Sequence, residues 1–132
     1  MVQDRRSGAA ASEWGHATAR AVAEKLGAAG MTQRSNECRL GAMRIVIKCA
    51  HVGTRSVGVT YRMLETLDQI VGAFERNDGS FELWSVSPDQ FKSNMRETRS
   101  QGPSKRKVAL VERSVFERYG KSLGCLNLIV AG

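Results

Sequence analysis

The sequence has no apolar run long enough to cross a membrane. Its first residues, MVQDRRS, lack the apolar core that a secretory signal requires. The last apolar stretch, residues 123–130, is also far too short to span a bilayer. From these absences we expect a cytoplasmic protein without a membrane partner.

Cysteine and histidine are scarce. The three cysteines, Cys38, Cys49 and Cys125, are widely spaced, and there is no Cys-x-x-Cys motif. An odd number of dispersed cysteines is not a disulfide framework and indicates a reducing compartment. His16 and His51 are the only histidines, and neither lies near a cysteine or a carboxylate at the spacing of zinc ligands. A zinc site is therefore not expected.

The motifs of several large enzyme classes are missing as well. There is no Gly-x-x-x-x-Gly-Lys-Ser/Thr loop that would hold nucleotide phosphates. Ser114 and Ser122 have no histidine near them in the sequence that would activate a serine nucleophile. No internal repeat or low-complexity segment is present.

What the chain does contain is an excess of positive charge, with a net charge of +7 over 132 residues. Such an excess favours contact with a polyanion. Part of this charge is concentrated in residues 92–107, where Glu97 is the only acid. This basic segment comprises Lys92, Arg96, Arg99, Lys105, Arg106 and Lys107. It either follows nucleic-acid phosphates or is a solvated loop that keeps the protein in solution, and the sequence leaves both interpretations open.

The length and the content of 42% hydrophobic and 25% charged residues fit one ordinary globular domain. We expect a flexible N-terminus over residues 1–11 and a single globular domain over residues 12–132. The apolar periodicity predicts helices over 13–26, 63–76, 88–99 and 114–119, and strands over 43–50, 56–61, 81–86 and 107–112. Residues 28–39 are expected to form a loop, and residues 123–130 either a last strand or a packed tail. The expected fold is α/β, bordering on α+β, with a small mixed β-sheet and helices packed on its faces.

Local signals refine this prediction. Ser12 is a candidate N-cap for the first helix. Gly53 and Thr54 form a plausible turn, so the first two strands are expected to pair as a hairpin. The run Ser87-Pro88-Asp89-Gln90 has the features of a helix start.

Lys48 is the most informative residue. It interrupts the otherwise apolar strand 43–50, and a lysine ammonium is rarely buried without a partner. Because side chains alternate along a strand, Arg44, Val46 and Lys48 share one face. Two cations on one face require an anion, either a carboxylate of this protein or a phosphate of a ligand. The alternative is an edge strand whose polar face lies in solvent.

The order helix, hairpin, helix, strand, with a lysine on the first long strand, resembles the core of the restriction endonuclease-like superfamily, the PD-(D/E)xK nucleases. The resemblance covers about residues 12–86. It implies a Mg²⁺ ion that polarises the scissile phosphate and a lysine that stabilises the attacking hydroxide. On this resemblance Lys48 takes the lysine position, Glu37 the upstream metal-binding acid position, and Glu13 that of a first-helix glutamate. An active member would be a Mg²⁺-dependent endonuclease.

The sequence departs from that pattern at Val46, which stands where an acid is expected two residues before Lys48. Either Glu37, Glu13 or Asp68 replaces the missing acid, or the domain no longer cuts. We therefore predict a nucleic-acid-binding protein, with DNA favoured over RNA, whose phosphodiesterase activity is weak or absent. The competing hypothesis is a homo-oligomeric interaction module without a nucleic-acid role. In that module the strand 81–86 or the C-terminal apolar stretch would form a homodimer contact.

Overall fold

The computed structural model describes residues 5–32, 35–97 and 108–127. Five strands form a central sheet in the order β1-β2-β4-β5-β8, and three form a second sheet in the order β3-β7-β6. The expected mixed α/β fold is confirmed, because β2 and β4 are parallel whereas the other neighbours in the central sheet are antiparallel. The elements are α1 (Arg5–Leu26), β1 (Glu37–Leu40), β2 (Met43–Ala50), β3 (Ser56–Thr60), α2 (Tyr61–Leu64), β4 (Gln69–Glu75), β5 (Ser80–Val86), α3 (Pro88–Asn94), β6 (Arg96–Glu97), β7 (Val108–Glu112), α4 (Arg113–Tyr119) and β8 (Lys121–Asn127).

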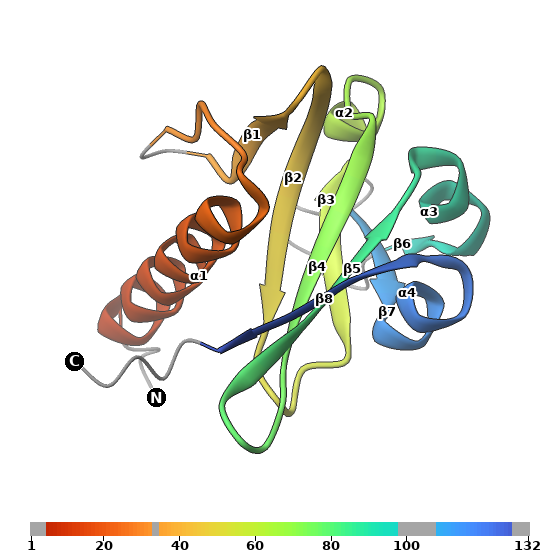
Figure 1. The fold of residues 1–132 in the computed structure, drawn as a ribbon. Helices are drawn as coiled ribbons and strands as arrows, with labels where there is room; N and C mark the ends of the chain where they lie inside the picture. Colours follow the sequence, from red (N-terminus) through yellow and green to blue (C-terminus); the bar gives the residue numbers. More distant parts are fainter. Residues whose placement is uncertain (1–4, 33–34, 98–107, 128–132) are drawn as a thin grey trace.

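The central sheet is covered on both faces. Helix α1 lies along one face, and the second sheet lies with α3 and α4 on the other (Figure 1). No helix in the described part of the chain is both long enough and apolar enough to pass through a bilayer.

The helix predicted over 63–76 is wrong, and this is the largest error of the sequence prediction. Only the short helix α2 forms there, and the apolar run that follows it is the middle strand of the central sheet. Residues 70–74 are all buried, and they alternate between the two faces. A strand covered on both sides is apolar at every position, and over a short window this resembles the stripe of a helix.

The predicted hairpin of the first two long strands is also wrong. Both strands exist, but β3 pairs with β7 in the second sheet. The reason is that both edges of β2 are already occupied, by β1 and by β4. Most of strand β1 falls in the segment 28–39, which was expected to be a loop.

Helix α1 begins at Arg5, so Ser12 lies inside the helix and the predicted cap is wrong. Alanine has the highest helix propensity, and residues 9–11 are all alanine, which extends the helix towards the N-terminus. The helix ends at Leu26, and Gly27 follows it with a left-handed φ of 76°. The amide of Gly27 donates to the Glu24 carbonyl, and that of Ala28 donates to the Ala23 carbonyl. These two bonds form a Schellman motif.

Helix α3 begins as predicted. The Ser87 hydroxyl accepts from the Gln90 amide at 3.1 Å, and the Gln90 side chain accepts from the Ser87 amide at 2.9 Å. This is a complete capping box with Pro88 in the first turn. The helix ends at Asn94, earlier than the expected 99, because β6 follows and pairs with β7.

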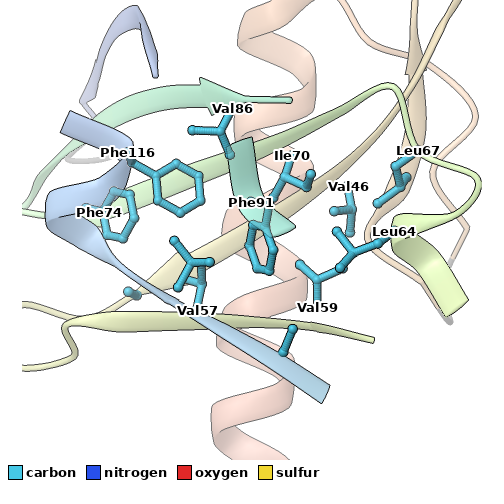
Figure 2. Packing of buried hydrophobic residues seen from close by; sticks show 13 residues of the cluster. Val46, Val57, Val59, Leu64, Leu67, Ile70, Phe74, Val86, Phe91 and Phe116 are labelled. Atoms are coloured by element: carbon cyan, nitrogen blue, oxygen red, sulfur yellow. The ribbon is translucent and has the colours of Figure 1, made fainter. Parts of the chain in front are cut away.

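The core between the central sheet and the second sheet is rich in phenylalanine (Figure 2). Phe74 from β4, Phe91 from α3 and Phe116 from α4 are each at most 1% exposed. Gly72 provides the space for two of these rings. A Cβ at this position would lie 2.6 Å from Cε2 of Phe74 and 3.0 Å from Cε1 of Phe116. The central sheet can therefore carry only glycine at this point without a shift of its neighbours.

Candidate functional site

Lys48 lies on β2 between Val46 and Ala50, on the face that meets the second sheet. The predicted alternation is confirmed, because Ile45 and Ile47 pack on the opposite face, against α1. Lys48 is half-buried, and desolvation lowers the pKa of its ammonium. None of the ion pairs between described residues includes Lys48. The strand therefore holds a cation that lacks a direct carboxylate partner in the described chain.

Glu37 is the carboxylate that influences the pKa of Lys48. It lies directly opposite Val46 in the β1–β2 pair, so its side chain shares the face of Lys48 and sits diagonal to it. The negative charge of Glu37 raises the pKa of Lys48, a smaller effect than desolvation. The Ser35 hydroxyl donates to Oε2 of Glu37 at 3.1 Å and fixes that carboxylate beside the strand.

Two arginines extend this face towards the β1–β2 turn. Arg39 and Arg44 lie directly opposite each other, and both are exposed. Like charges at directly opposed positions destabilise a strand pair unless an anion lies between them. A pocket of about 310 Å³ opens beside them, and its lining also includes Thr32, Ser35 and Glu37. We call Glu37, Arg39, Arg44 and Lys48 the β-hairpin cluster.

Sequence reasoning placed Arg44 with Lys48 but missed Arg39. The signal was the two-residue turn at residues 41–42, where Gly41 has a φ of 61°. A glycine turn joining two polar-apolar segments is typical of a hairpin. A hairpin centred on this turn predicts both strand β1 and its register with β2.

A Mg²⁺ ion does not fit this arrangement. Val46 is fully buried beside Leu64 and Leu67, so its position offers no ligand. Over the described ranges, no three His, Cys, Asp or Glu side chains come together in a way that could hold a metal ion. Glu37 would be the only carboxylate of the β-hairpin cluster on the ion. The residues present do not suit the metal implied by the resemblance.

The other candidate acids lie away from Lys48. Glu13 is exposed on α1, which covers the opposite face of the sheet, so the fold does not bring it to Lys48. Asp68 is in the loop before β4, and its Oδ2 accepts from the Arg44 amide at 2.8 Å. That bond anchors the first residues of β2.

The basic segment is only partly described. Lys92 is exposed on α3, and Arg96 of β6 forms an ion pair with Glu112 at 3.0 Å. Arg99, Lys105, Arg106 and Lys107 lie outside the described residues. Figure 1 places α3 and β6 far from β1, so Lys92 and Arg96 are not part of the β-hairpin cluster.

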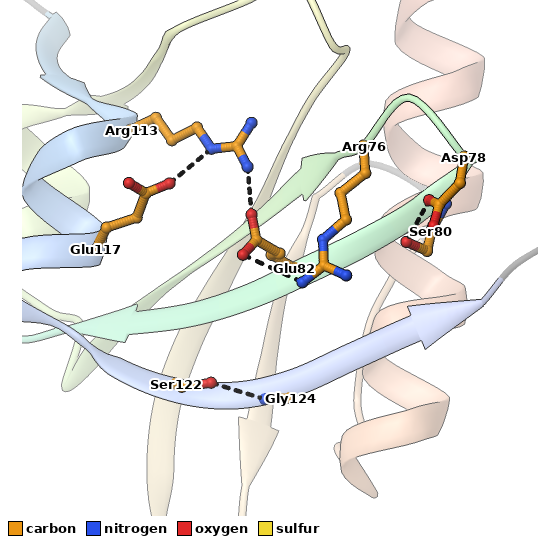
Figure 3. Close-up of polar contacts among 8 residues, drawn as sticks. All are labelled: Arg76, Asp78, Ser80, Glu82, Arg113, Glu117, Ser122 and Gly124. Atoms are coloured by element: carbon orange, nitrogen blue, oxygen red, sulfur yellow. Dashed lines mark hydrogen bonds and ion pairs between the residues drawn. The ribbon is translucent and has the colours of Figure 1, made fainter.

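A second group of charges is satisfied internally. Glu82 of β5 contacts Arg76 at 3.2 Å and also pairs with Arg113 (Figure 3). Arg113 bonds Glu117 at 3.0 Å and lies 5.4 Å from the centre of the Phe74 ring. These mutual contacts tie α4 to the central sheet, so we assign them a structural role.

Strand β5 also bears on the competing homodimer hypothesis. Its two edges pair with β4 and β8, and Phe81 is buried, so the strand 81–86 has no free edge for a partner. Strand β8 lies at the edge of the sheet, and most of its residues are exposed.

Comparisons with known proteins identify no relative of this chain. Neither the protein-family models nor the curated proteins that were searched match the chain.

Proposed function

We propose that this protein binds nucleic-acid phosphates through the β-hairpin cluster, with DNA favoured over RNA, and that it cuts weakly or not at all. The observation that carries the proposal is the half-buried Lys48 on the same face as Arg39 and Arg44, with Glu37 as the only carboxylate among them. Three cations against Glu37 and the neighbouring Asp68, whose Oδ2 accepts from the Arg44 amide, still leave a local excess of positive charge. A phosphate would offset both the desolvation of Lys48 and the repulsion between the two arginines.

The chemistry of the cluster favours binding over cleavage. Arginine side chains hold phosphate oxygens through paired N–H donors, and a lysine adds a point charge. Metal-assisted cleavage requires carboxylates around the ion, and Val46 supplies none. The resemblance to PD-(D/E)xK nucleases adds no support to this proposal, because the hairpin and the long second helix on which it rested do not form.

The test is a fluorescence anisotropy titration of a labelled duplex DNA over a range of salt concentrations. We expect affinity to fall steeply with salt, because each neutralised phosphate releases counterions. The double variant Arg39→Gln/Arg44→Gln should bind more weakly, and its salt slope should be smaller by about two. The matched control Arg20→Gln/Arg118→Gln removes the same charge from exposed positions on α1 and α4 and should keep the wild-type slope.

Three results would contradict the proposal. The first is the absence of DNA binding by the wild type at low salt, which would favour the oligomeric module, and light scattering would then show a dimer. The second is an equal loss of affinity in the control double variant. The third is robust cleavage with Mg²⁺ or Mn²⁺ that survives Lys48→Met. A triple alanine variant at Lys105, Arg106 and Lys107 measures separately what the basic segment contributes.

A further inference from the structure

The face of the central sheet that carries α1 also holds a groove that the function proposed above does not use. It has a volume of about 330 Å³ and is lined by residues from β1, β2, β4, β5 and β8. Neighbouring strands lie about 4.8 Å apart, so a groove that crosses five of them is roughly 19 Å long. Its volume falls within the range of small-molecule sites. We call it the sheet groove.

The two ends of the sheet groove differ in chemistry. At the β1–β2 end the walls are the side chains of Leu40, Met43 and Ile45. At the β4–β5–β8 end Gln69, Ser85 and Lys121 line the groove together with the apolar Val71 and Leu123. All the polar side chains of the lining therefore lie at one end of the groove, and the rest of the lining is apolar.

The polar end contains a buried hydroxyl. Ser85 is only 9% exposed, and its hydroxyl donates to Oε1 of Gln69 at 2.6 Å. Because Oε1 of Gln69 accepts this bond, the amide nitrogen of the same side chain has two N–H donors to offer. These donors have no partner within the described residues. Lys121 is exposed at the same end and adds a positive charge.

We propose that the sheet groove binds a linear apolar carboxylate, such as a medium-chain fatty acid. Its carboxylate accepts from the Gln69 amide and pairs with the Lys121 ammonium. Its chain lies over Ile45 towards Leu40 and Met43. The positive charge of Lys121 would repel a cationic head group, so the groove favours a ligand with an anionic head group.

Titration calorimetry tests this proposal with octanoate below its micellar concentration. We expect saturable binding at one site per chain. Octylamine, which has the same chain and the opposite charge, should not bind. Hexanoate and decanoate should bind more weakly and more tightly, respectively, with about tenfold in affinity for each two methylenes.

Two variants probe the two ends. Lys121→Gln should weaken octanoate binding about tenfold, because it removes a charge-assisted contact. Met43→Glu should abolish binding by placing a charge against the chain. Each variant has a matched control outside the groove. Lys25→Gln removes a positive charge as Lys121→Gln does, and Val52→Glu adds a negative charge as Met43→Glu does. Val52 is 44% exposed and Met43 is 38% exposed, so both glutamates enter partly solvated positions.

Thermal unfolding of each variant shows whether it is still folded. A loss of binding in a folded variant can then be assigned to the groove. No saturable binding of octanoate or decanoate to the wild type would overturn the proposal. Equal affinity for octanoate and octylamine would overturn it too. If octanoate binds but folded Lys121→Gln and Met43→Glu retain full affinity, the ligand occupies another surface and the assignment is wrong.

Discussion

The rings of Phe74 and Phe116 meet edge to face, with centroids 5.2 Å apart and planes at 67°. This contact joins α4 to the middle strand of the central sheet, and it exists because Gly72 has no side chain. Aromatic pairs of this geometry add to the burial of their surfaces.

Gly72→Ala should therefore lower the free energy of unfolding by about 1–3 kcal/mol, the usual cost of overpacking a core. Urea denaturation measures it. Gly53→Ala is the matched control, since a Cβ at Gly53 would have nothing within 4 Å. Similar losses in both variants would contradict the packing described for Phe116.

Leu67 is 6% exposed and packs against Val46 and the phenylalanine core. Leu67→Ala should cost roughly 2–5 kcal/mol in urea unfolding, the range for a buried leucine. Val52→Ala, at a position that is 44% exposed, should change stability by less than about 0.5 kcal/mol. A loss below one kilocalorie for Leu67→Ala would place this loop at the surface.

Lys48 should make stability depend on pH in the alkaline range. Its pKa is lowered by desolvation from the ordinary 10.5, so the unfolded chain binds more protons between the lowered value and 10.5. The wild type should gain stability as pH rises through that window. Lys48→Met removes the buried charge, so the variant should be more stable than the wild type at pH 7, with a difference that shrinks towards pH 10.5.

Urea unfolding at several pH values measures this difference. Lys92→Met removes an exposed lysine and should show no such convergence. If Lys48→Met is instead less stable at neutral pH, Glu37 stabilises the ammonium more than burial destabilises it.

The three cysteines should differ in reactivity. Burial raises the pKa of Cys49 to about 12 and also raises that of Cys38, whereas Cys125 is exposed on β8. Because the thiolate is the nucleophile, iodoacetamide at pH 8 should label Cys125 first. Mass spectrometry of native and urea-unfolded protein measures the order. Early labelling of Cys49 in the native protein would contradict its position in the sheet.

Several elements could be predicted because their signal is local. The Ser87 capping box identified α3, and the alternation around Lys48 assigned both faces of β2. The middle strand β4 was missed because residues 70–74 are apolar without interruption, a pattern shared by buried helices and doubly covered strands. The partner of β3 could not be predicted either, since it depends on which edges of β2 are already filled.

The β-hairpin cluster was partly predictable, because the alternation of side chains along β2 is also a local signal. Alternation alone placed Arg44 with Lys48, whereas Arg39 and Glu37 join them through the register of β1. The sheet groove had no sequence signal, because its walls come from five strands that are spread between residues 40 and 123 and meet only through the pairing of the sheet.

The position of β8 has a consequence for the order of folding. The last described strand pairs with β5, and β2 pairs with β4 across an intervening strand and helix. Such non-local pairs raise contact order, so the chain must close long loops before their contacts stabilise it. During synthesis β5 keeps one open edge until residues 121–127 emerge. Until then the nascent chain exposes an unpaired strand with Phe81 and Leu83, a species prone to aggregate and suited to chaperone binding.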